Sequence, residues 1–392
     1  MQNKMTNLPQ GWEVKKLEDV CKNSSSNLAL KDIKNKSGDY PVFGASGIVG
    51  YIDFYHKNKE CLGIVKDGAG VGRVFVLPKN TSVIGTLNYL EALENTNLKY
   101  LFYFLYSIDF SKYILGSAIP HIYFRDYKKE QIPLPPLKEQ ERIVGILDES
   151  FAKIDESIKI LEQDLLNLDE LMQSALQKAF NPLKDNAKEN YKLPQGWEWK
   201  NLGEICFITD GTHKTPNYIE TGIPFLSVKN ISKGFFDLSD VKYISLEEHN
   251  KLIKRAKPEF GDILICRIGT LGKAIKISLE FEFSIFVSLG LLKPKVKIIS
   301  DYLVYFLNSY FIEGWINNNK VGGGTHTAKL NLNILEKCPV VLPPLKEQEQ
   351  IASHLDELSS HVKNLKQNYQ AQIEDLQELK KSLLDKAFKG NL

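Results

Sequence analysis

The sequence predicts a mixed α/β (α+β) fold with two strand-containing domains separated by a pair of long antiparallel coiled-coil helices. Three observations predict this architecture and its internal pseudo-twofold repeat. Blocks of sequence recur in the same order in both halves of the 392-residue chain. A heptad series of apolar residues follows each block. The blocks themselves hold short apolar and β-branched runs between Gly, Asn and Pro turns, which is typical of short strands.

The repeat is clearest in a sixteen-residue segment that begins with a double proline. LPPLKEQERIVGILDE, residues 134–149, returns as LPPLKEQEQIASHLDE, residues 342–357, with twelve of sixteen positions identical. Proline suits the first turn of a helix, and acidic residues favour the positive end of the helix dipole. Each copy therefore predicts the start of a helix.

Two further pairs of segments support the duplication. LPQGWEVKKLEDVC, residues 8–21, returns as LPQGWEWKNLGEIC, residues 193–206, and nine of the fourteen positions are identical. YLFYFLYS, from Tyr100, matches YLVYFLNS, from Tyr302, at six of eight positions. Both Tyr segments are apolar enough to predict helices buried in the core of each domain. All anchors keep their order, so the chain is a tandem duplication with insertions in the second copy.

After each helix start, apolar residues alternate by four and three and form an a/d seam. The second seam slips by one residue near Tyr369, and Lys366 and Lys380 stand where a strict copy would place apolar residues. About 44 residues at about 1.5 Å each predict a rod of about 65 Å. The predicted seam residues are Leu147, Phe151, Ile154, Ile158, Leu161, Leu165 and Leu168 in the first helix, and Leu355, Leu358, Val362, Leu365, Ile373 and Leu376 in the second.

These patterns predict five segments. They are a first domain at 1–136, a central helix at 137–180, a polar linker at 181–192, a second domain at 193–344 and a C-terminal helix at 345–392. Lys and Arg outnumber Asp and Glu by 17 to 13 in residues 1–133 and by 21 to 17 in residues 181–341. The first helical segment is acidic, with 5 basic against 10 acidic residues in 134–180. Two mildly basic domains are compatible with surfaces that face a polyanion.

Composition excludes several classes of protein. The chain is 43% apolar and 25% charged, which is ordinary for a globular protein with a core. No apolar run has the length of a signal peptide or a membrane span, so we expect a cytoplasmic protein. The five cysteines are odd in number and include no C-x-x-C pair, which predicts reduced, mostly buried thiols rather than disulfides or a zinc site.

No catalytic constellation is recognisable. GAGVGR, at residues 68–73, and GTLGK, at residues 269–273, lack the spacing of a phosphate-binding loop, so both predict tight turns beside strands. His213 and His326 lie in Gly- and Thr-rich segments with no Cys or carboxylate at metal-ligand spacing, so no metal site is predicted. We therefore expect that the chain has no catalytic activity of its own.

The duplicated LPPLKEQE at the head of a heptad helix and the duplicated LPQGWE before a variable domain resemble the DNA specificity subunit of type I restriction-modification systems. The resemblance covers essentially the whole chain. It implies that each variable domain is a target recognition domain for one half of a bipartite sequence in double-stranded DNA. It also implies that the helices set the half-site spacing and dock two methyltransferase subunits, with restriction or motor subunits joining through the complex.

The same resemblance implies that this chain holds no cofactor, and that S-adenosylmethionine, ATP and magnesium belong to the partner subunits. Two alternatives remain open at the level of sequence. The chain could be a detached specificity subunit of a different, fused restriction-methylation enzyme. It could also be a coiled-coil adaptor whose basic domains bind protein, in which case it would show no sequence-dependent retention on DNA.

Candidate DNA-contacting residues are polar side chains in loops or at strand ends, because base edges are read by such groups and phosphates bind Lys and Arg. Lys66 and Arg267 are the strongest pair, since each stands two residues before a glycine in its repeat. The candidates are Ser46, Lys66, Arg73, His121, Tyr123 and Arg125 in the first domain, and Thr212, His213, Lys214, Lys229, Asn230, Arg267, Lys273, His326 and Lys329 in the second.

Overall fold

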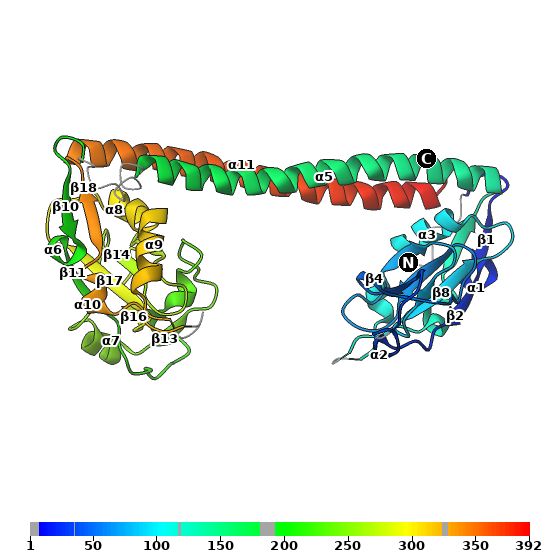
Figure 1. The fold of residues 1–392 in the computed structure, drawn as a ribbon, viewed down its shortest axis with the longest axis horizontal. Helices are drawn as coiled ribbons and strands as arrows, with labels where there is room; N and C mark the ends of the chain where they lie inside the picture. The colour runs from blue at the N-terminus through cyan, green and yellow to red at the C-terminus, as the bar shows by residue number, and fades with distance from the viewer. Residues whose placement is uncertain (1–7, 35, 117–118, 181–192, 324–327) are drawn as a thin grey trace. The chain divides into compact units, whose positions relative to one another are not determined.

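A computed structural model of the chain describes residues 8–34, 36–116, 119–180, 193–323 and 328–392 (Figure 1). The chain divides into two compact units, Met1–Glu162 with Tyr369–Leu392, and Gln163–Asn368. Both dividing points fall inside a long helix, so each unit holds one globular domain and a part of each helix. The predicted linker 181–192 and His326 lie outside the described residues.

The described residues of the first unit form three sheets. A four-stranded antiparallel sheet has the order β2-β8-β5-β6, a three-stranded sheet has the order β4-β3-β7, and β1 pairs with β9. Its strands are β1 (Glu13–Lys16), β2 (Cys21–Ser25), β3 (Tyr40–Gly44), β4 (Gly47–Ile52), β5 (Cys61–Val65), β6 (Val74–Leu77), β7 (Ser82–Val83), β8 (Leu87–Ala92) and β9 (Gln131–Leu134). Its short helices are α1 (Leu17–Val20), α2 (Leu30–Ile33), α3 (Leu98–Ser107), η1 (Phe110–Tyr113) and α4 (Phe124–Tyr127).

The second unit repeats this topology. Its sheets have the orders β11-β17-β14-β15, β13-β12-β16 and β10-β18. Its strands are β10 (Glu198–Asn201), β11 (Cys206–Asp210), β12 (Ile223–Leu226), β13 (Lys242–Ile244), β14 (Ile263–Cys266), β15 (Ala274–Lys276), β16 (Ser284–Ile285), β17 (Leu289–Pro294) and β18 (Pro339–Leu342). Its short helices are α6 (Leu202–Ile205), η3 (Val228–Asn230), α7 (Leu246–Leu252), α8 (Ser300–Leu307), α9 (Tyr310–Asn319) and α10 (Leu332–Leu335).

The long helices are α5 (Leu137–Ala179) and α11 (Leu345–Phe388). They begin directly after the double prolines, as the repeated segments predict. In the first unit Asp155 of α5 pairs with Lys380 of α11, and Arg142 donates to the Leu392 carbonyl. In the second unit Asp169 pairs with Lys366. The partner numbers fall along one helix as they rise along the other, so the two helices run antiparallel.

Each four-stranded sheet has a core on both faces. In the first unit one face packs against α3 and the long helices, and the other packs against the three-stranded sheet. The predicted apolar helices are confirmed as α3 and α8, and Tyr100 and Tyr302 are fully buried in them. All five cysteines are buried free thiols, as predicted. Burial raises the pKa of Cys21 and Cys206 to about 12.

The glutamine of the repeated KEQE segment fixes each long helix to its domain. Gln140 is fully buried, and its Nε2 donates to the Pro135 carbonyl at 2.8 Å and the Asn95 carbonyl at 2.9 Å. Its Oε1 accepts from the Asn97 amide, at the start of α3. Gln348 makes equivalent bonds to the Pro343 carbonyl and from the Ile299 amide. A buried amide with satisfied hydrogen bonds fixes orientation, which explains why this residue recurs.

A second repeated contact lies two helical turns further along. Asp148 of α5 accepts from the Tyr103 hydroxyl at 2.7 Å, and Asp356 of α11 accepts from the Tyr305 hydroxyl at 2.7 Å. Both tyrosines have a pKa raised by burial and then by the adjacent carboxylate. In each copy of the repeated segment the glutamine and the aspartate are eight residues apart, and both contact the same buried helix, α3 in the first unit and α8 in the second.

The end of each long helix completes the core of the domain encoded in the other half of the sequence. Phe180 follows α5 and packs on Tyr302 and Phe306 of α8, with ring centroids 5.8 and 5.3 Å apart. Phe388 ends α11 and packs on Tyr100 and Phe104 of α3, at 5.3 and 5.4 Å. The aromatic contacts repeat because α3 and α8 present aromatic residues at equivalent positions to the end of a long helix.

The predicted seam needs one correction. Leu365 is 40% exposed, and the neighbouring Lys366 turns toward α5 and pairs with Asp169. Lys380 is likewise only 13% exposed, lies 4.8 Å from the Phe151 ring centroid and pairs with Asp155. With these two lysines as seam positions, steps of four and three alternate regularly from Val362 to Leu383, without the slip near Tyr369. A lysine can occupy such a position because its aliphatic stem packs while its ammonium reaches a flanking acid.

A double-mutant cycle between Lys380→Met and Asp155→Asn is expected to give a coupling of about 0.5–1 kcal/mol in the free energy of unfolding. The pair bridges two helices and Lys380 is mostly buried, whereas Asp155 is 62% exposed, which limits the value. Urea unfolding measures it. The Lys381–Glu378 pair, exposed on one helix, is the control and should couple less. Equal coupling in both cycles would contradict a role for Lys380 in pairing the helices.

Candidate nucleic-acid interface

Most candidate residues lie around one loop in each domain, which joins the second and third strands, in chain order, of the four-stranded sheet. In the first domain this loop joins β5 to β6: the Val65 amide donates to the Arg73 carbonyl and the Gly72 amide to the Val65 carbonyl, both at 2.9 Å. In the second domain the Cys266 amide donates to the Lys273 carbonyl at 2.8 Å. Arg73 and Lys273 therefore occupy equivalent positions.

The glycines of these loops are required by their backbone. Gly72 and Gly272 have φ of +86° and +83°, a region that favours glycine. A Cβ on Gly272 would also lie 2.4 Å from Ile316 Cδ1, and one on Gly72 would lie 2.8 Å from Phe110 Cβ. The prediction of tight turns beside strands is confirmed.

A short bridge covers each loop. His121 pairs with Asp67 and Leu115 in the first domain, and Lys329 pairs with Ile268 and Val321 in the second. His121 and Lys329 therefore occupy equivalent positions beside the glycine loops. The sequence predicted both as DNA-contacting residues, and the structure brings each next to the other candidates of its own domain.

In the first domain, three candidates line one cavity of about 540 Å³. Lys66 follows β5, and Tyr123 and Arg125 lie at the start of α4. The Arg125 guanidinium lies 4.4 Å from the Tyr123 ring centroid, and the His121 ring lies 5.0 Å away on the same tyrosine. The full lining is Glu18, Asn23, Lys66, Asn88, Tyr123, Phe124, Arg125 and Lys128.

Ser46 and Arg73 lie on neighbouring turns of the same domain. Ser46 is exposed in the turn between β3 and β4. The Arg73 guanidinium donates to the carbonyl of Ala45, the preceding residue, at 3.0 Å. All six first-domain candidates therefore lie on or near the glycine loop, although Ser46, Arg73 and His121 do not line the cavity.

In the second domain the position of Lys66 is taken by Arg267, and its environment is different. Arg267 is 6% exposed; it donates to Asp210 at 2.5 Å, the Val287 carbonyl at 3.0 Å and the Leu330 carbonyl at 3.1 Å. Burial lowers the pKa of this guanidinium. The side chain is committed to contacts within its own domain, so contact of Arg267 with DNA stays a prediction.

Asp210 is the centre of this buried cluster. It is 1% exposed and also pairs with Arg255 and with His213, whose Nε2 lies 3.0 Å from Oδ2. Thr212 and Lys214 close the adjacent turn, where the Lys214 amide donates to the Thr212 hydroxyl at 3.2 Å. The cluster therefore orients the exposed His213 and the turn that carries Thr212 and Lys214.

Asn230 and Lys229 form the end of η3 and differ in exposure. Asn230 is 4% exposed; its Oδ1 accepts from the Ser227 amide and its Nδ2 donates to the carbonyls of Asp237 and Asp240. Its amide holds the loop after η3, and contact with DNA stays a prediction. Lys229 is exposed.

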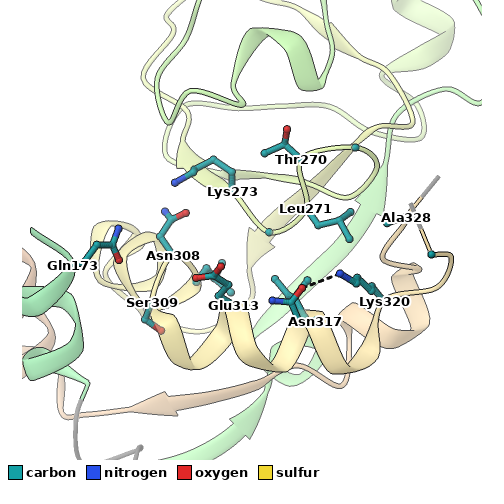
Figure 2. Close-up of a pocket in the computed structure, with 15 residues that line it drawn as sticks. Gln173, Thr270, Leu271, Lys273, Asn308, Ser309, Glu313, Asn317, Lys320 and Ala328 are labelled. Atoms are coloured by element: carbon teal, nitrogen blue, oxygen red, sulfur yellow. Dashed lines mark hydrogen bonds between the residues drawn. The ribbon is translucent and has the colours of Figure 1, made fainter. Parts of the chain in front are cut away.

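Lys273 lines a separate cavity of about 600 Å³ in the second unit. Figure 2 shows Thr270 and Lys273 on the glycine loop, across from Glu313 and Asn317 on α9. The Lys320 ammonium lies 3.0 Å from the Asn317 oxygen. Lys273 and Lys320 lie on either side of Glu313, so the cavity is polar and carries charges of both signs.

Among the residues of these clusters that were not predicted are Asn23, Asn88, Asp210 and Arg255. A signal for three of them exists in the strands. Cys21 and Leu90 point into a core, so residues two positions away, Asn23 and Asn88, must point to the same face. Asp210 lies four positions from Cys206, which is twice that spacing, so it points to the same face as Cys206. Arg255 lies outside any strand, and its contact with Asp210 joins residues 45 positions apart.

No group of three or more His, Cys, Asp or Glu residues could hold a metal ion in the part of the chain that the structure describes. Nor is any helix in the described ranges long and apolar enough to cross a membrane. The side chains of the candidate surfaces are cations, amides, hydroxyls and aromatic rings, which are groups that bind nucleic acids.

Comparison with known proteins gives one family for nearly the whole chain. The family described as "Type I restriction modification DNA specificity domain" matches residues 9–165 and 194–375. The MjaVIII specificity subunit of Methanocaldococcus jannaschii is 23% identical over 98% of this chain and 94% of its own length. The EcoBI specificity subunit of Escherichia coli is 27% identical over 70% of this chain, and the match spans 61% of that subunit.

Solved structures show the same fold. A chain from a structure of a type I R-M system, titled for its complex assembly and conformational transition, superimposes with a TM-score of 0.77 and 23% identity. That match covers 98% of this chain and 100% of the other. The HsdS subunit from Thermoanaerobacter tengcongensis gives a TM-score of 0.58 at 22% identity, with full coverage of both chains.

Proposed function

Because the chain belongs to the family of type I restriction modification DNA specificity domains, we propose that it is a DNA-recognition subunit whose two domains each read one half of a bipartite target. The observation that carries this proposal is a duplicated site with different side chains. The glycine loop, its covering bridge and the end of the sheet face recur in both domains, but Lys66, Asn88 and Ser25 become Arg267, Gly290 and Asp210. Two domains that recognise different half-sites need the same backbone framework with different side chains on the DNA-facing surface.

The chemistry of the candidates supports DNA as the partner. Lys, Arg, Ser, Thr and His side chains surround the glycine loops, and such groups bind phosphates and base edges. A basic excess of four residues in each of the two domain-bearing segments adds a general attraction to a polyanion. In this proposal the chain acts in the cytoplasm, where it meets the DNA.

The long helices have two roles in the proposal. They set the separation of the half-sites, because readers held at a fixed distance engage the groove at a fixed phase. They also dock two methyltransferase subunits, and restriction or motor subunits join through that complex. Acidic residues on α5 supply a polar surface distinct from the basic domains, and Ile160, Leu166 and Leu171 lie exposed on the same helix.

The chain contributes recognition and no catalysis in this proposal. S-adenosylmethionine, ATP and magnesium would be bound by the partner subunits, which carry out modification and restriction. The residues of this chain would position the DNA relative to those subunits. A detached subunit of a fused enzyme and a protein-binding adaptor are the alternatives that the experiment must separate.

Genome-wide mapping of methylated adenines in a host with and without this gene tests the proposal. We expect a bipartite motif that is methylated only when the gene is present. In a second arm, residues 1–136 are replaced by the first domain of another family member, and we expect one half of the motif to change while the other half stays. An unchanged methylation map, or a change in both halves, would contradict the proposed division of labour. Loss of a contiguous motif instead would favour a fused enzyme.

A further inference from the structure

We propose that the cavity lined by Asn23, Lys66, Asn88 and Tyr123 in the first domain binds a DNA base with an exocyclic amino group, adenine or cytosine, that has left the base stack. The inference rests on the proposed function, since it names the group that one domain would recognise. It goes further by assigning a site and a chemical class of ligand to the first domain alone. We call this site the amide pocket.

The register of the strands builds the amide pocket at one end of a sheet face. Ile64 of β5 lies opposite Asn88 of β8, and Leu90 of β8 lies opposite Asn23 of β2. Side chains alternate between the faces, so Asn23, Asn88 and Lys66 continue the face on which Cys21, Leu90 and Ile64 form the core. The apolar face therefore ends in a polar floor made of two amides, with the Lys66 ammonium at its rim.

The floor of the pocket has acceptors without partners. The Oδ1 atoms of Asn23 and Asn88 are buried and have no hydrogen-bond partner among the residues that the structure describes, and Asn88 is only 6% exposed. Buried polar atoms are nearly always paired, so an exception indicates a ligand or a functional role. A ligand that satisfies these atoms must present hydrogen-bond donors. The amino groups of adenine and cytosine are such donors, and asparagine pairs with the edge of adenine through both its amide atoms.

The rim of the pocket favours a ring over an anion. Each of its cations has an acidic neighbour: Lys66 lies 2.5 Å from Asp67, and Lys128 lies 2.6 Å from Glu18. Arg125 lies 3.6 Å from Asp126 and 4.4 Å from the Tyr123 ring centroid. The rim charges balance, so the rim lacks the excess positive charge that a phosphate needs. Tyr123 is 40% exposed and presents a π face, on which a base can stack.

In the second domain a side chain fills the space that corresponds to the amide pocket. Gly290 stands opposite Asp210 where Asn88 stands opposite Ser25, and Ile208 replaces Asn23. The Arg267 side chain occupies this space: its Cδ would lie 3.8 Å from a Cβ on Gly290, and its guanidinium pairs with Asp210. The amide pocket is therefore not a general property of the scaffold. It varies between the two domains, as a device for reading one half-site should.

The burial of Asn88 is the reason for inferring a base outside the stack. Asn88 lies on the floor and is almost fully buried, so the edge of a base that remains paired in the groove cannot reach it. A base that rotates out of the duplex can enter a concave site, where stacking and hydrogen bonds replace those it has lost. The cavity volume of about 540 Å³ is ample for one base.

The test uses the full chain assembled with its methyltransferase subunits and duplexes that carry the target found by methylation mapping. Asn88→Leu keeps the size of the side chain and removes its polar atoms. We expect affinity for the target to fall by about 10- to 150-fold, with discrimination lost at one adenine or cytosine position of the first half-site. Discrimination in the second half-site should be unchanged. Fluorescence anisotropy measures both.

A second pair of variants guards against misfolding. Tyr123→Leu removes the stacking face of an exposed residue and should weaken binding about 5- to 150-fold, whereas Tyr123→Phe keeps the ring and should bind like the parent chain. Asn58→Ala, an exposed asparagine of the same domain, is the control for loss of an amide elsewhere. Thermal unfolding supplies an independent readout: an amide that only supports the fold would lower the melting temperature on Asn88→Leu, and a ligand-binding amide without partners would not.

A third arm tests whether the base leaves the stack. Duplexes with an abasic site opposite the recognised base should bind the parent chain more tightly, because the base is already unpaired, and Asn88→Leu should lose that gain. Uniform weakening of all sequences by Asn88→Leu and Tyr123→Leu would indicate a phosphate contact and overturn the inference. Unchanged discrimination in both variants would overturn it as well. If the parent complex itself shows no preference for the mapped target, the proposed function fails instead.

Discussion

Replacing Phe180 with alanine is expected to lower the free energy of unfolding of the second unit by about 3–5 kcal/mol. Phe180 is 3% exposed and packs edge-on against Tyr302 and Phe306. Removing a buried aromatic ring costs its transfer free energy and leaves a cavity that the surrounding core fills only in part. The loss should appear in the second unit although Phe180 belongs to the first sequence repeat. Urea unfolding followed by tryptophan fluorescence measures it, since Trp197, Trp199 and Trp315 all lie in that unit.

Phe388→Ala is the matched variant for the first unit, because Phe388 packs in the same way on Tyr100 and Phe104. Hydrogen exchange should show each variant loosening only the unit that contains the lost contact. Leu171→Ala is the control on α5; Leu171 is 48% exposed, so the change should stay within about 0.5 kcal/mol. Equal loosening of both units by Phe180→Ala would show that the units do not have separate cores.

The repeat and the fold class could be predicted from the sequence because they depend on local and periodic signals. A double proline, a heptad and an apolar run each report on neighbouring residues. The role of Gln140 could not be predicted in this way, since its partner is the Asn97 amide, 43 positions earlier. Identity of the two segments showed that the glutamine recurs, but only the packing of α3 against α5 explains why.

The seam shows where a binary apolar pattern gives the wrong result. Leu365 and Lys366 are neighbours, and the apolar residue was assigned to the seam. In the structure Lys366 faces α5 because Asp169 lies opposite it, and Leu365 is exposed. The periodicity of the helix was correct. The prediction that an apolar residue occupies this seam position was wrong, because the position is set by Asp169 in the other helix.

Lys66 and Arg267 show the same limit at the candidate site. The sequence paired them correctly, because both follow the second core strand and precede a glycine loop. Their environments differ because Ser25 and Asp210 stand at equivalent places on the neighbouring strand. A buried carboxylate draws the arginine into the domain, whereas Lys66 pairs with Asp67 at the edge of a cavity. A pattern in one segment cannot report on the charge of another.

Arg267→Ala is therefore expected to destabilise the second domain by about 3 kcal/mol, and Lys66→Ala to change the stability of the first domain by less than about 1 kcal/mol. Asp210 is 1% exposed, and the loss of Arg267 leaves this buried carboxylate with Arg255 and His213 alone. Lys66 keeps a quarter of its side chain exposed, and its one ion pair is with Asp67. Urea unfolding of the two variants measures the difference.

The double variant Asp210→Asn with Arg267→Met separates the cost of an unpaired charge from the value of the pair. Replacing a buried ion pair by uncharged groups of similar volume is often neutral, so the double variant should recover much of the stability lost in Arg267→Ala. The effects on DNA should run the opposite way: Lys66→Ala should weaken binding through the first half-site while the fold is kept. If Arg267→Ala unfolds like the parent chain, the buried cluster around Asp210 does not stabilise the domain. Contact with DNA would then be the better explanation for Arg267.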